Sequence, residues 1–159
     1  MRSEHETSVK PAEVCVVIPT FNERGNLSNL IKRITSALAG INWEIIVVDD
    51  DSTDGTAAEA RAMYSADARV RCIRRLGRRG LSSACIEGML ASSARFLAVM
   101  DGDLQHDPAV LRAMYDTLAA NEADLVIGSR YAGGGSVGQL DRRRLMISQF
   151  ATRLANRVT

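Results

Sequence analysis

The sequence predicts an α/β fold in which helices cover both faces of a mostly parallel sheet. Short apolar runs alternate with segments whose apolar residues recur at helical spacing, and this alternation is typical of parallel sheets. Charged residues directly follow several of the apolar runs, and the carboxyl ends of parallel strands share one edge of a sheet. The length of 159 residues suffices for one domain with a substantial core.

The predicted elements follow one another as β and α along most of the chain. The predicted strands are the apolar runs Val14–Ile18, Trp43–Val48, Val70–Ile73, Phe96–Met100 and Asp124–Ser129. The predicted helices are Leu27–Leu38, Ala57–Met63, Leu81–Ala94, Pro108–Asn121 and Asp141–Val158. Asp107 is expected to cap the fourth helix, with Pro108 at its first position. A polar tail is predicted for residues 1–12 and a glycine-rich loop for Tyr131–Gly138.

The apolar run Phe96–Met100 leads directly into two carboxylates, Asp101 and Asp103, with Gln105 two residues further on. A continuous apolar run predicts a central strand that is buried on both faces. Gly102 keeps the backbone between the two acids compact and flexible. Because carboxylate and amide oxygens are hard ligands, Asp101, Asp103 and Gln105 predict a site for Mg²⁺ or Mn²⁺ rather than zinc.

Composition limits the partners and the compartment. The formal net charge of +1 provides no overall field for nucleic acid, so no nucleic-acid partner is expected. The three cysteines, at positions 15, 72 and 85, have no paired spacing, which predicts reduced thiols in the cytoplasm. No apolar run approaches the length of a transmembrane helix, and the first residues contain no signal-peptide core.

Three common α/β classes fit the residues poorly. A dinucleotide-binding Rossmann domain requires a glycine-rich turn after its first strand, where this chain has Pro-Thr-Phe-Asn-Glu. A receiver domain requires a lysine at the end of a late strand, but lysines occur here only at positions 10 and 32. Phosphatases of the haloacid-dehalogenase type also place Asp-x-Asp after an apolar strand. In those enzymes, however, the motif opens the chain and a lysine follows it.

Four motifs, in order, match one family. The segments VVIPTFNE, IIVVDDDSTDGT, VMDGDLQHDP and DLVIGSRY resemble family 2 glycosyltransferases with the GT-A fold. Within that family the chain looks most like the branch of dolichol-phosphate mannosyltransferases and other polyprenyl-phosphate glycosyltransferases. The resemblance runs from about Val14 to the chain end. It implies a Rossmann-like, nucleotide-sugar-binding GT-A domain over residues 13–159, corresponding to the donor-binding half and truncated at its C-terminus.

The resemblance also implies roles for particular positions. The donor pocket would be lined by Pro19, Phe21, Glu23, Val48, Asp50, Asp101, Gly102, Asp103 and Arg130. The metal ligands would be Asp101, Asp103 and Gln105. Arg130 would stabilise charge on the departing diphosphate, and Arg144 and Ser148 would hold the acceptor phosphate. The catalytic set would therefore be Asp103, Arg130 and Arg144.

The implied reaction is a metal-dependent, inverting transfer of a sugar from GDP-mannose or a UDP-hexose to a polyprenyl (dolichyl-type) phosphate. Such an acceptor is already anionic at pH 7 and needs no general base, whereas a sugar hydroxyl would need a carboxylate. Two alternatives stay open: a non-catalytic nucleotide-sugar-binding module, or a family 2 transferase that acts on a saccharide. Because the family domain continues well past this length, the isolated chain is expected to show little or no transfer.

The last predicted helix suggests where the chain acts. Its apolar residues Ile147, Phe150, Ala151, Leu154 and Val158 share one face and are accompanied by arginines, which suits an anionic membrane surface. The protein is therefore expected to be peripheral at the cytoplasmic face of a membrane. The alternative is an ordinary helix that packs on the sheet or on a second copy. An unfinished sheet edge also invites pairing in a homodimer.

The chain departs from the family pattern before the third predicted helix, where Gly80-Leu81-Ser82 replaces the family's Gly-Leu-Gly, and at two other positions. Asp51 stands where the family usually has glycine, and Phe21 stands where it usually has tyrosine. A basic turn contains Arg74, Arg75, Arg78 and Arg79. These arginines are expected either to form a solvated face or, through Arg78, to contact the nucleotide phosphates.

Overall fold

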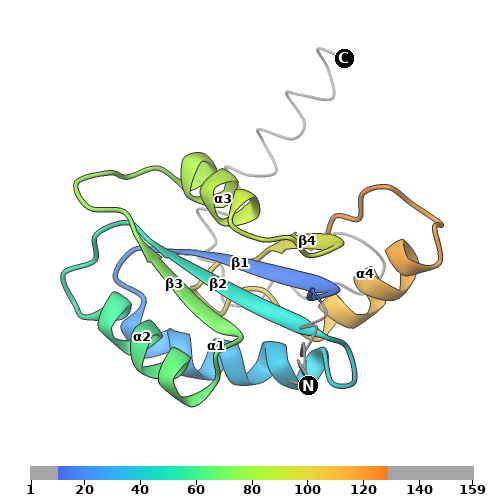
Figure 1. Cartoon of the computed structure of the whole chain (residues 1–159), viewed down its shortest axis with the longest axis horizontal. Helices are drawn as coiled ribbons and strands as arrows, with labels where there is room; N and C mark the ends of the chain where they lie inside the picture. Colours follow the sequence, from blue (N-terminus) through green and yellow to red (C-terminus); the bar gives the residue numbers. More distant parts are fainter. Residues whose placement is uncertain (1–10, 129–159) are drawn as a thin grey trace, which may run out of the picture. The chain divides into compact units, whose positions relative to one another are not determined.

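The computed structural model describes residues 11–128, which form a parallel four-stranded sheet with helices on both faces (Figure 1). The strands are β1 (Val14–Thr20), β2 (Trp43–Asp49), β3 (Val70–Arg74) and β4 (Phe96–Val99). They are arranged in the order β3-β2-β1-β4, and every pairing is parallel. The predicted α/β class with a parallel sheet is therefore confirmed.

The helices divide between the two faces of the sheet. They are α1 (Arg24–Ala37), α2 (Thr56–Ala66), α3 (Leu81–Leu90) and α4 (Val110–Ala119). Figure 1 shows α1 and α2 below the sheet and α3 above it, and α1 also contacts α4. The apolar face of α1 is fully or nearly fully buried, as its helical spacing predicts, through Leu27, Leu30, Ile31 and Ile34.

Strand β1 is the centre of the core, and all seven of its residues are buried. Because successive strand residues face opposite sides, Val16 and Ile18 join the larger cluster, which includes the buried residues of α1. Cys15 and Val17 join a smaller cluster beneath α3. Burial on both faces explains why β1 is continuously apolar rather than alternating.

Within residues 11–128, the strand before Asp101 is neither central in the sheet nor buried on both faces. In the described part of the chain, β4 lies at the edge of the sheet and pairs only with β1. Phe96 and Ala98 pack against the larger cluster, but Leu97 and Val99 on the opposite face are 43% and 42% exposed. An apolar run shows that a segment can be buried, but its position in the sheet depends on which strands pair with it.

The predicted fifth strand is also not seen in its described portion. No strand is assigned to residues 124–128, and the side chains of Leu125 and Ile127 are 74% and 76% exposed. The physical reason is that this segment joins no ladder within residues 11–128, and an apolar run becomes a strand only with a partner. Ser129 and the segments predicted as loop Tyr131–Gly138 and helix Asp141–Val158 lie outside the described residues.

Two of the helix boundaries that differ from their predicted positions have a visible local cause. Helix α3 ends at Leu90, four residues before the predicted Ala94, because Ser92 starts a turn in which its hydroxyl accepts the Ala94 N–H at 3.0 Å. Helix α4 begins at Val110 rather than Pro108. The Asp107 carboxylate accepts the Ala109 N–H at 3.1 Å, so the capping role predicted for Asp107 serves the turn that precedes the helix.

The chain divides into two compact units, Met1–Val126 and Ile127–Thr159. The first unit contains every helix and strand described above. Whether residues 13–159 form one domain stays a prediction. None of the helices within residues 11–128 is long and apolar enough to cross a membrane.

Candidate functional site

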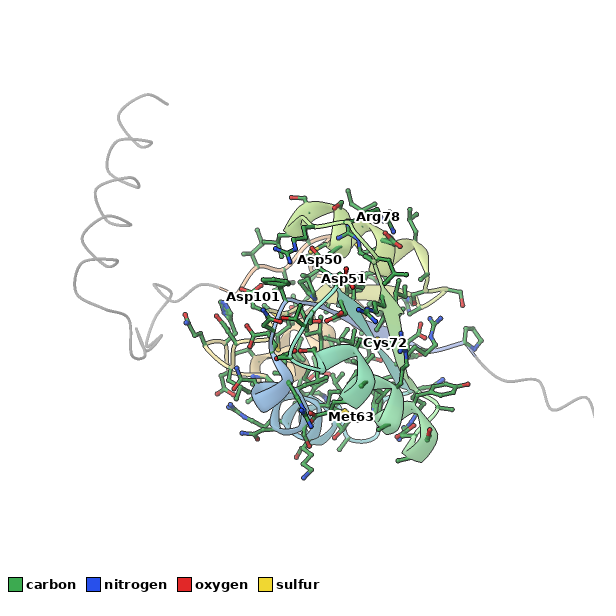
Figure 2. The ribbon with its side chains drawn as sticks, turned by 90° about the vertical axis from the view of Figure 1, so that its left-hand side faces the viewer. Asp50, Asp51, Met63, Cys72, Arg78 and Asp101 are labelled. Atoms are coloured by element: carbon green, nitrogen blue, oxygen red, sulfur yellow. The ribbon has the colours of Figure 1, made fainter. Side chains whose placement is uncertain are left out.

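The loops that follow β1 and β2 are joined by hydrogen bonds at the carboxyl ends of the strands. The backbone N–H of Asn22 donates to the Ser52 hydroxyl at 2.8 Å, and the Thr53 N–H donates to the Asn22 side chain at 3.0 Å. The Glu23 N–H donates to the Thr56 hydroxyl at 3.0 Å, which ties the start of α1 to the start of α2. Figure 2 looks onto this end of the sheet, where Asp50, Asp51 and Asp101 are labelled.

Asp49, the last residue of β2, has a structural role. Its carboxylate is fully buried and accepts hydrogen bonds from the Ser52 N–H at 3.0 Å, the Ser52 hydroxyl and the Thr20 hydroxyl. These bonds fix the turn between β2 and α2 and attach it to the end of β1. Asp49 therefore positions the surrounding loops and faces no solvent.

Asp50 holds the loop between β3 and α3, and its carboxylate has a partner on each oxygen. The guanidinium of Arg75 lies 2.7 Å from Oδ1, and the backbone N–H of Gly80 lies 2.7 Å from Oδ2. Arg75 is only 3% exposed and also donates to the Gly80 carbonyl and to the Ser83 hydroxyl. A solvated face is therefore the wrong prediction for Arg75, because Asp50 draws its charge into the interior.

Asp51 holds the same loop at a second point. Its carboxylate accepts hydrogen bonds from the Arg74 guanidinium at 2.6 Å and from the Gly77 N–H at 3.3 Å. The Arg74 hydrogen bond, followed by that of Gly77, lowers the pKa of Asp51 below its usual value. The backbone of Asp51 has a φ of 57°, the left-handed region that glycine adopts most readily. Asp51, which stands where the family usually has glycine, therefore combines an unfavourable backbone conformation with an ionic contact to Arg74.

The two remaining arginines of the turn make different contacts. Arg78 donates 2.8 Å hydrogen bonds to both carboxylate oxygens of Glu87 on α3. The guanidinium carbon of Arg79 lies 4.1 Å from the centre of the Phe21 ring. Phe21 directly follows β1 and is 42% exposed. Sequence reasoning missed this contact, because only the folded sheet brings the ends of β1 and β3 together.

The loop after β4 carries the predicted metal ligands. Asp101 and Asp103 are partly exposed and Gln105 is exposed, while Gly102 between the acids is buried. A Cβ atom at Gly102 would lie 3.3 Å from side-chain atoms of Glu23 and of Thr20. The absence of a side chain at Gly102 therefore lets this loop pack closely against the residues that follow β1.

The oxygen donors of this loop fit a hard divalent cation by type. Asp101 and Asp103 supply carboxylates and Gln105 an amide oxygen, the ligands that Mg²⁺ and Mn²⁺ prefer. In the described residues the Asp103 carboxylate accepts the Gln105 N–H at 3.0 Å, and Nε2 of His106 lies 3.3 Å from the Asp101 carboxylate. No group of three or more His, Cys, Asp or Glu side chains within residues 11–128 is arranged to hold a metal ion.

A left-handed residue shapes this loop. Leu104 has a φ of 60°, which is uncommon for a residue with a branched side chain, and it packs against the larger core cluster. The contact of Leu104 with the core therefore lies between the acidic residues of this loop.

Burial, followed by the charges of Asp101 and Asp50, raises the pKa of the Cys85 thiol on α3. The thiol therefore lies within electrostatic reach of both carboxylates.

The structure gathers most of the predicted donor-site residues at one edge of the sheet. Phe21, Glu23 and Asp50 all lie at the carboxyl ends of β1 and β2. Val48 pairs with Pro19 across the sheet, and both residues are buried. The side chain of Val48 is fully buried in the cluster beneath α3, and its place in the donor pocket stays a prediction. Arg130, Arg144 and Ser148 lie outside the described residues.

A comparison with models of protein families identifies the family to which the chain belongs. Residues 15–158 match the model described as "Glycosyl transferase family 2". The chain belongs to glycosyl transferase family 2. The resemblance seen in the sequence motifs is therefore confirmed, and the match extends over the first unit and into the second.

Curated members of glycosyl transferase family 2 cover most of the chain. It is 46% identical over 139 residues to a dolichol-phosphate mannosyltransferase of Pyrococcus furiosus, covering 87% of this chain and 39% of the relative. It is 39% identical over 153 residues to a polyprenol monophosphomannose synthase of Mycolicibacterium smegmatis, covering 93% of this chain and 57% of the relative. The chain thus spans about two to three fifths of the length of these relatives.

Solved structures share the fold. A mannosyltransferase from Pyrobaculum calidifontis in complex with GDP-Man and Mn²⁺ has a TM-score of 0.59 at 23% identity, covering 70% of this chain and 33% of that protein. A glucosyl-3-phosphoglycerate synthase from Mycobacterium tuberculosis in complex with Mn²⁺, UDP and glucosyl-3-phosphoglycerate has a TM-score of 0.54 at 25% identity. It covers 67% of this chain and 39% of that protein. These likenesses confirm the predicted Rossmann-like architecture of family 2.

Proposed function

We propose that the chain binds a nucleotide-sugar donor together with Mg²⁺ or Mn²⁺, and that the protein transfers the sugar to a polyprenyl phosphate. The observation that carries this proposal is the close packing of the loop containing Asp101 and Asp103 against Glu23, at the end of the sheet where Phe21 and Asp50 also lie. In open parallel sheets this edge is where ligands bind. Relatives named dolichol-phosphate mannosyltransferase and polyprenol monophosphomannose synthase support it, as do the Mn²⁺ complexes of related structures.

The proposed roles follow from the charge that develops in the reaction. A nucleotide sugar releases a nucleoside diphosphate, so negative charge grows on the bridging oxygen. A divalent cation held by Asp101, Asp103 and Gln105 would neutralise that charge when bound. Arg130 is proposed to contact the diphosphate, since a guanidinium grips phosphate oxygens through two donors. The remaining proposed contacts are those of Arg144 and Ser148 with the acceptor phosphate.

The metal assignment predicts the effect of one substitution. Asp103→Ala should abolish detectable metal-dependent binding of GDP and UDP, because it removes a carboxylate that bridges protein and diphosphate through the cation. Isothermal titration calorimetry with each nucleotide, in Mn²⁺ and in EDTA, measures this directly. Asp116→Ala is the matched control, because it removes the same charge from an exposed ion pair with Arg112 on α4. An Asp103→Ala variant that binds Mn²⁺ and nucleotide as tightly as the parent would show that the metal lies elsewhere.

A second candidate function is binding of a nucleotide sugar without catalysis. Transfer of labelled sugar from GDP-mannose to a polyprenyl phosphate separates the two functions. Binding without transfer would favour the non-catalytic function, and transfer would favour the enzyme. Transfer to a saccharide with none to the lipid phosphate would instead support the remaining alternative.

A further inference from the structure

The two outer strands of the described sheet, β3 and β4, present different side chains to solvent. On β3, Arg71 and Arg74 are charged, and each is held by a carboxylate of β2 or of the loop that follows it. Charged side chains on an outer strand discourage pairing with another chain. On β4 the exposed side chains are those of Leu97 and Val99. Within residues 11–128, the β4 edge therefore lacks the protection that the β3 edge has.

Leu97 and Val99 form an apolar strip, here called the β4 strip, on the side of the sheet that α3 covers. They pair with Cys15 and Val17 of β1, which are buried in the smaller cluster beneath α3. Helix α3 packs over β1 and β2, so the same face of β4 stays partly exposed beside it. An exposed apolar strip next to a packed helix is typical of a surface that a partner covers.

The backbone of β4 also presents hydrogen-bonding groups at this edge. The N–H groups of Phe96 and Met100 donate to carbonyls in and just before β1, at 2.9 and 3.0 Å. Because alternate residues of a strand bond to opposite neighbours, the N–H and C=O groups of Leu97 and Val99 face outward. No strand pairs with them within residues 11–128. Lipid would leave these groups unsatisfied, so the edge suits another β-strand better than a membrane.

Opposite charges lie at the two ends of β4. Arg95 precedes the strand and is exposed, with its guanidinium carbon 4.7 Å from the centre of the Phe96 ring. Asp101 and Asp103 follow the strand and are partly exposed. An antiparallel second copy of β4 brings the basic end of each strand to the acidic end of the other, whereas a parallel copy sets like charges side by side. The charges therefore favour the antiparallel arrangement.

We propose that two copies of the chain associate through β4, antiparallel, about a twofold axis at Ala98. In this register Leu97 of one copy pairs with Val99 of the other, and Arg95 lies opposite Asp101. The outward N–H and C=O groups bond across the interface, and the two four-stranded sheets become one. The strands of the two copies point in opposite directions, so the two candidate sites lie at opposite edges. The inference does not depend on the proposed function.

Sedimentation equilibrium of the whole chain measures this association, at low salt and with EDTA to keep the proposed metal off Asp101. Because β4 is short, we expect a weak dimer with a dissociation constant of roughly 1–100 µM. Leu97→Pro should weaken it about tenfold, because proline removes an outward N–H and leaves the bonds of Phe96 and Met100 to the β1 segment intact. Leu90→Ser is the control, since it removes an exposed apolar side chain of α3 outside the β4 strip.

An exchange of charges tests the register. Arg95→Glu and Asp101→Arg should each be monomeric at concentrations where the parent dimerises, because like charges then oppose each other across the twofold axis. An equimolar mixture of the two variants should dimerise again, since every altered charge then meets an opposite charge on the other variant. Circular dichroism verifies that each variant is folded. Leu97→Lys, which places a charge in the β4 strip, replaces Leu97→Pro if that variant does not fold.

Three results would overturn the proposal. The first is a parent that stays monomeric at the highest concentration reached, and the second is a dimer that both Leu97 variants leave unchanged. The third is a mixture of the two charge variants that remains monomeric, because the strands then do not meet in this register. A monomeric parent whose binding to phosphatidylserine vesicles is lost in Leu97→Lys would show that the β4 strip contacts lipid instead.

Discussion

At the residue scale, three consecutive carboxylates, Asp49 to Asp51, perform three different tasks. Asp49 is buried and fixes the turn before α2, Asp50 binds the buried Arg75, and Asp51 binds the exposed Arg74. Their environments range from fully enclosed to partly exposed, although the side chains are chemically identical. The consequences of losing each carboxylate should differ accordingly.

Asp49→Ala should destabilise the fold, because the hydroxyl and the N–H of Ser52 would lose their acceptor in a buried environment, and the Thr20 hydroxyl would keep only the Val48 carbonyl. Each buried donor left without a partner costs about 1–3 kcal/mol. Urea denaturation followed by circular dichroism measures the loss. Asp51→Ala is the control: its ionic contact is exposed to solvent, so its midpoint should shift less. Equal midpoints for Asp49→Ala and the parent would contradict the structural role of Asp49.

At the scale of elements, the two faces of the sheet are packed differently. Helix α1 covers one face with large residues such as Leu27 and Ile34. Helix α3 covers the other face with small ones, since its buried residues are Ala84 and Gly88. A Cβ atom added at Gly88 would lie 2.4 Å from a methyl group of Val17 and 2.9 Å from one of Val48. The small residues therefore allow α3 to approach β1 and β2 closely.

Gly88→Ala should lower stability even though alanine favours helices. Overpacking costs about 1–3 kcal/mol, which exceeds the gain of roughly 0.5–1 kcal/mol from replacing glycine within a helix. Gly25→Ala in α1 is a matched control, because nothing lies within 4 Å of a Cβ atom there. Thermal or urea denaturation should show the control to be at least as stable as the parent. A stabilised Gly88→Ala would mean that α3 sits farther from the sheet.

The positions of the helices and strands along the chain were largely predictable from the sequence. The pairing of strands and the contacts between residues distant in the sequence were not. Apolar periodicity located β1 and the buried face of α1, because both depend on residues close together in the chain. The edge position of β4 and the burial of Arg75 depend on strand pairing and on Asp50, which lies 25 positions away. Similarly, the motifs indicated Asp101 and Asp103, whereas the contact of Arg79 with Phe21 appears only once the sheet is assembled.

At the scale of the whole molecule, the proposed lipid acceptor requires contact with a membrane. The part of the chain that the structure describes has no helix able to cross one. Peripheral attachment through residues 141–158, whose apolar and arginine side chains recur at helical spacing, therefore stays a prediction from sequence. Homodimer formation also stays a prediction.

The membrane proposal predicts binding to anionic vesicles that weakens with salt, because basic residues near such a surface contribute about 1 kcal/mol each. Flotation with phosphatidylserine-containing vesicles measures it. Replacing Arg142 and Arg143 together by alanine should reduce the bound fraction. Replacing Arg33 and Arg112, exposed arginines of α1 and α4, serves as the control for net charge. No binding by the parent at low salt would contradict the proposal.

The strand order also has a consequence during synthesis on the ribosome. Val14 of β1 pairs with Trp43 on one side and with Phe96 on the other. The first partner is made soon after β1, but the second follows roughly 80 residues later, which at about 5–20 residues per second is a delay of about 4–16 s. Throughout that interval β1, whose seven residues are all buried in the folded chain, has one open edge. When translation is slow, the open edge of β1 is exposed for longer. A chaperone that binds extended apolar segments should therefore associate with the nascent chain before β4 emerges from the ribosome.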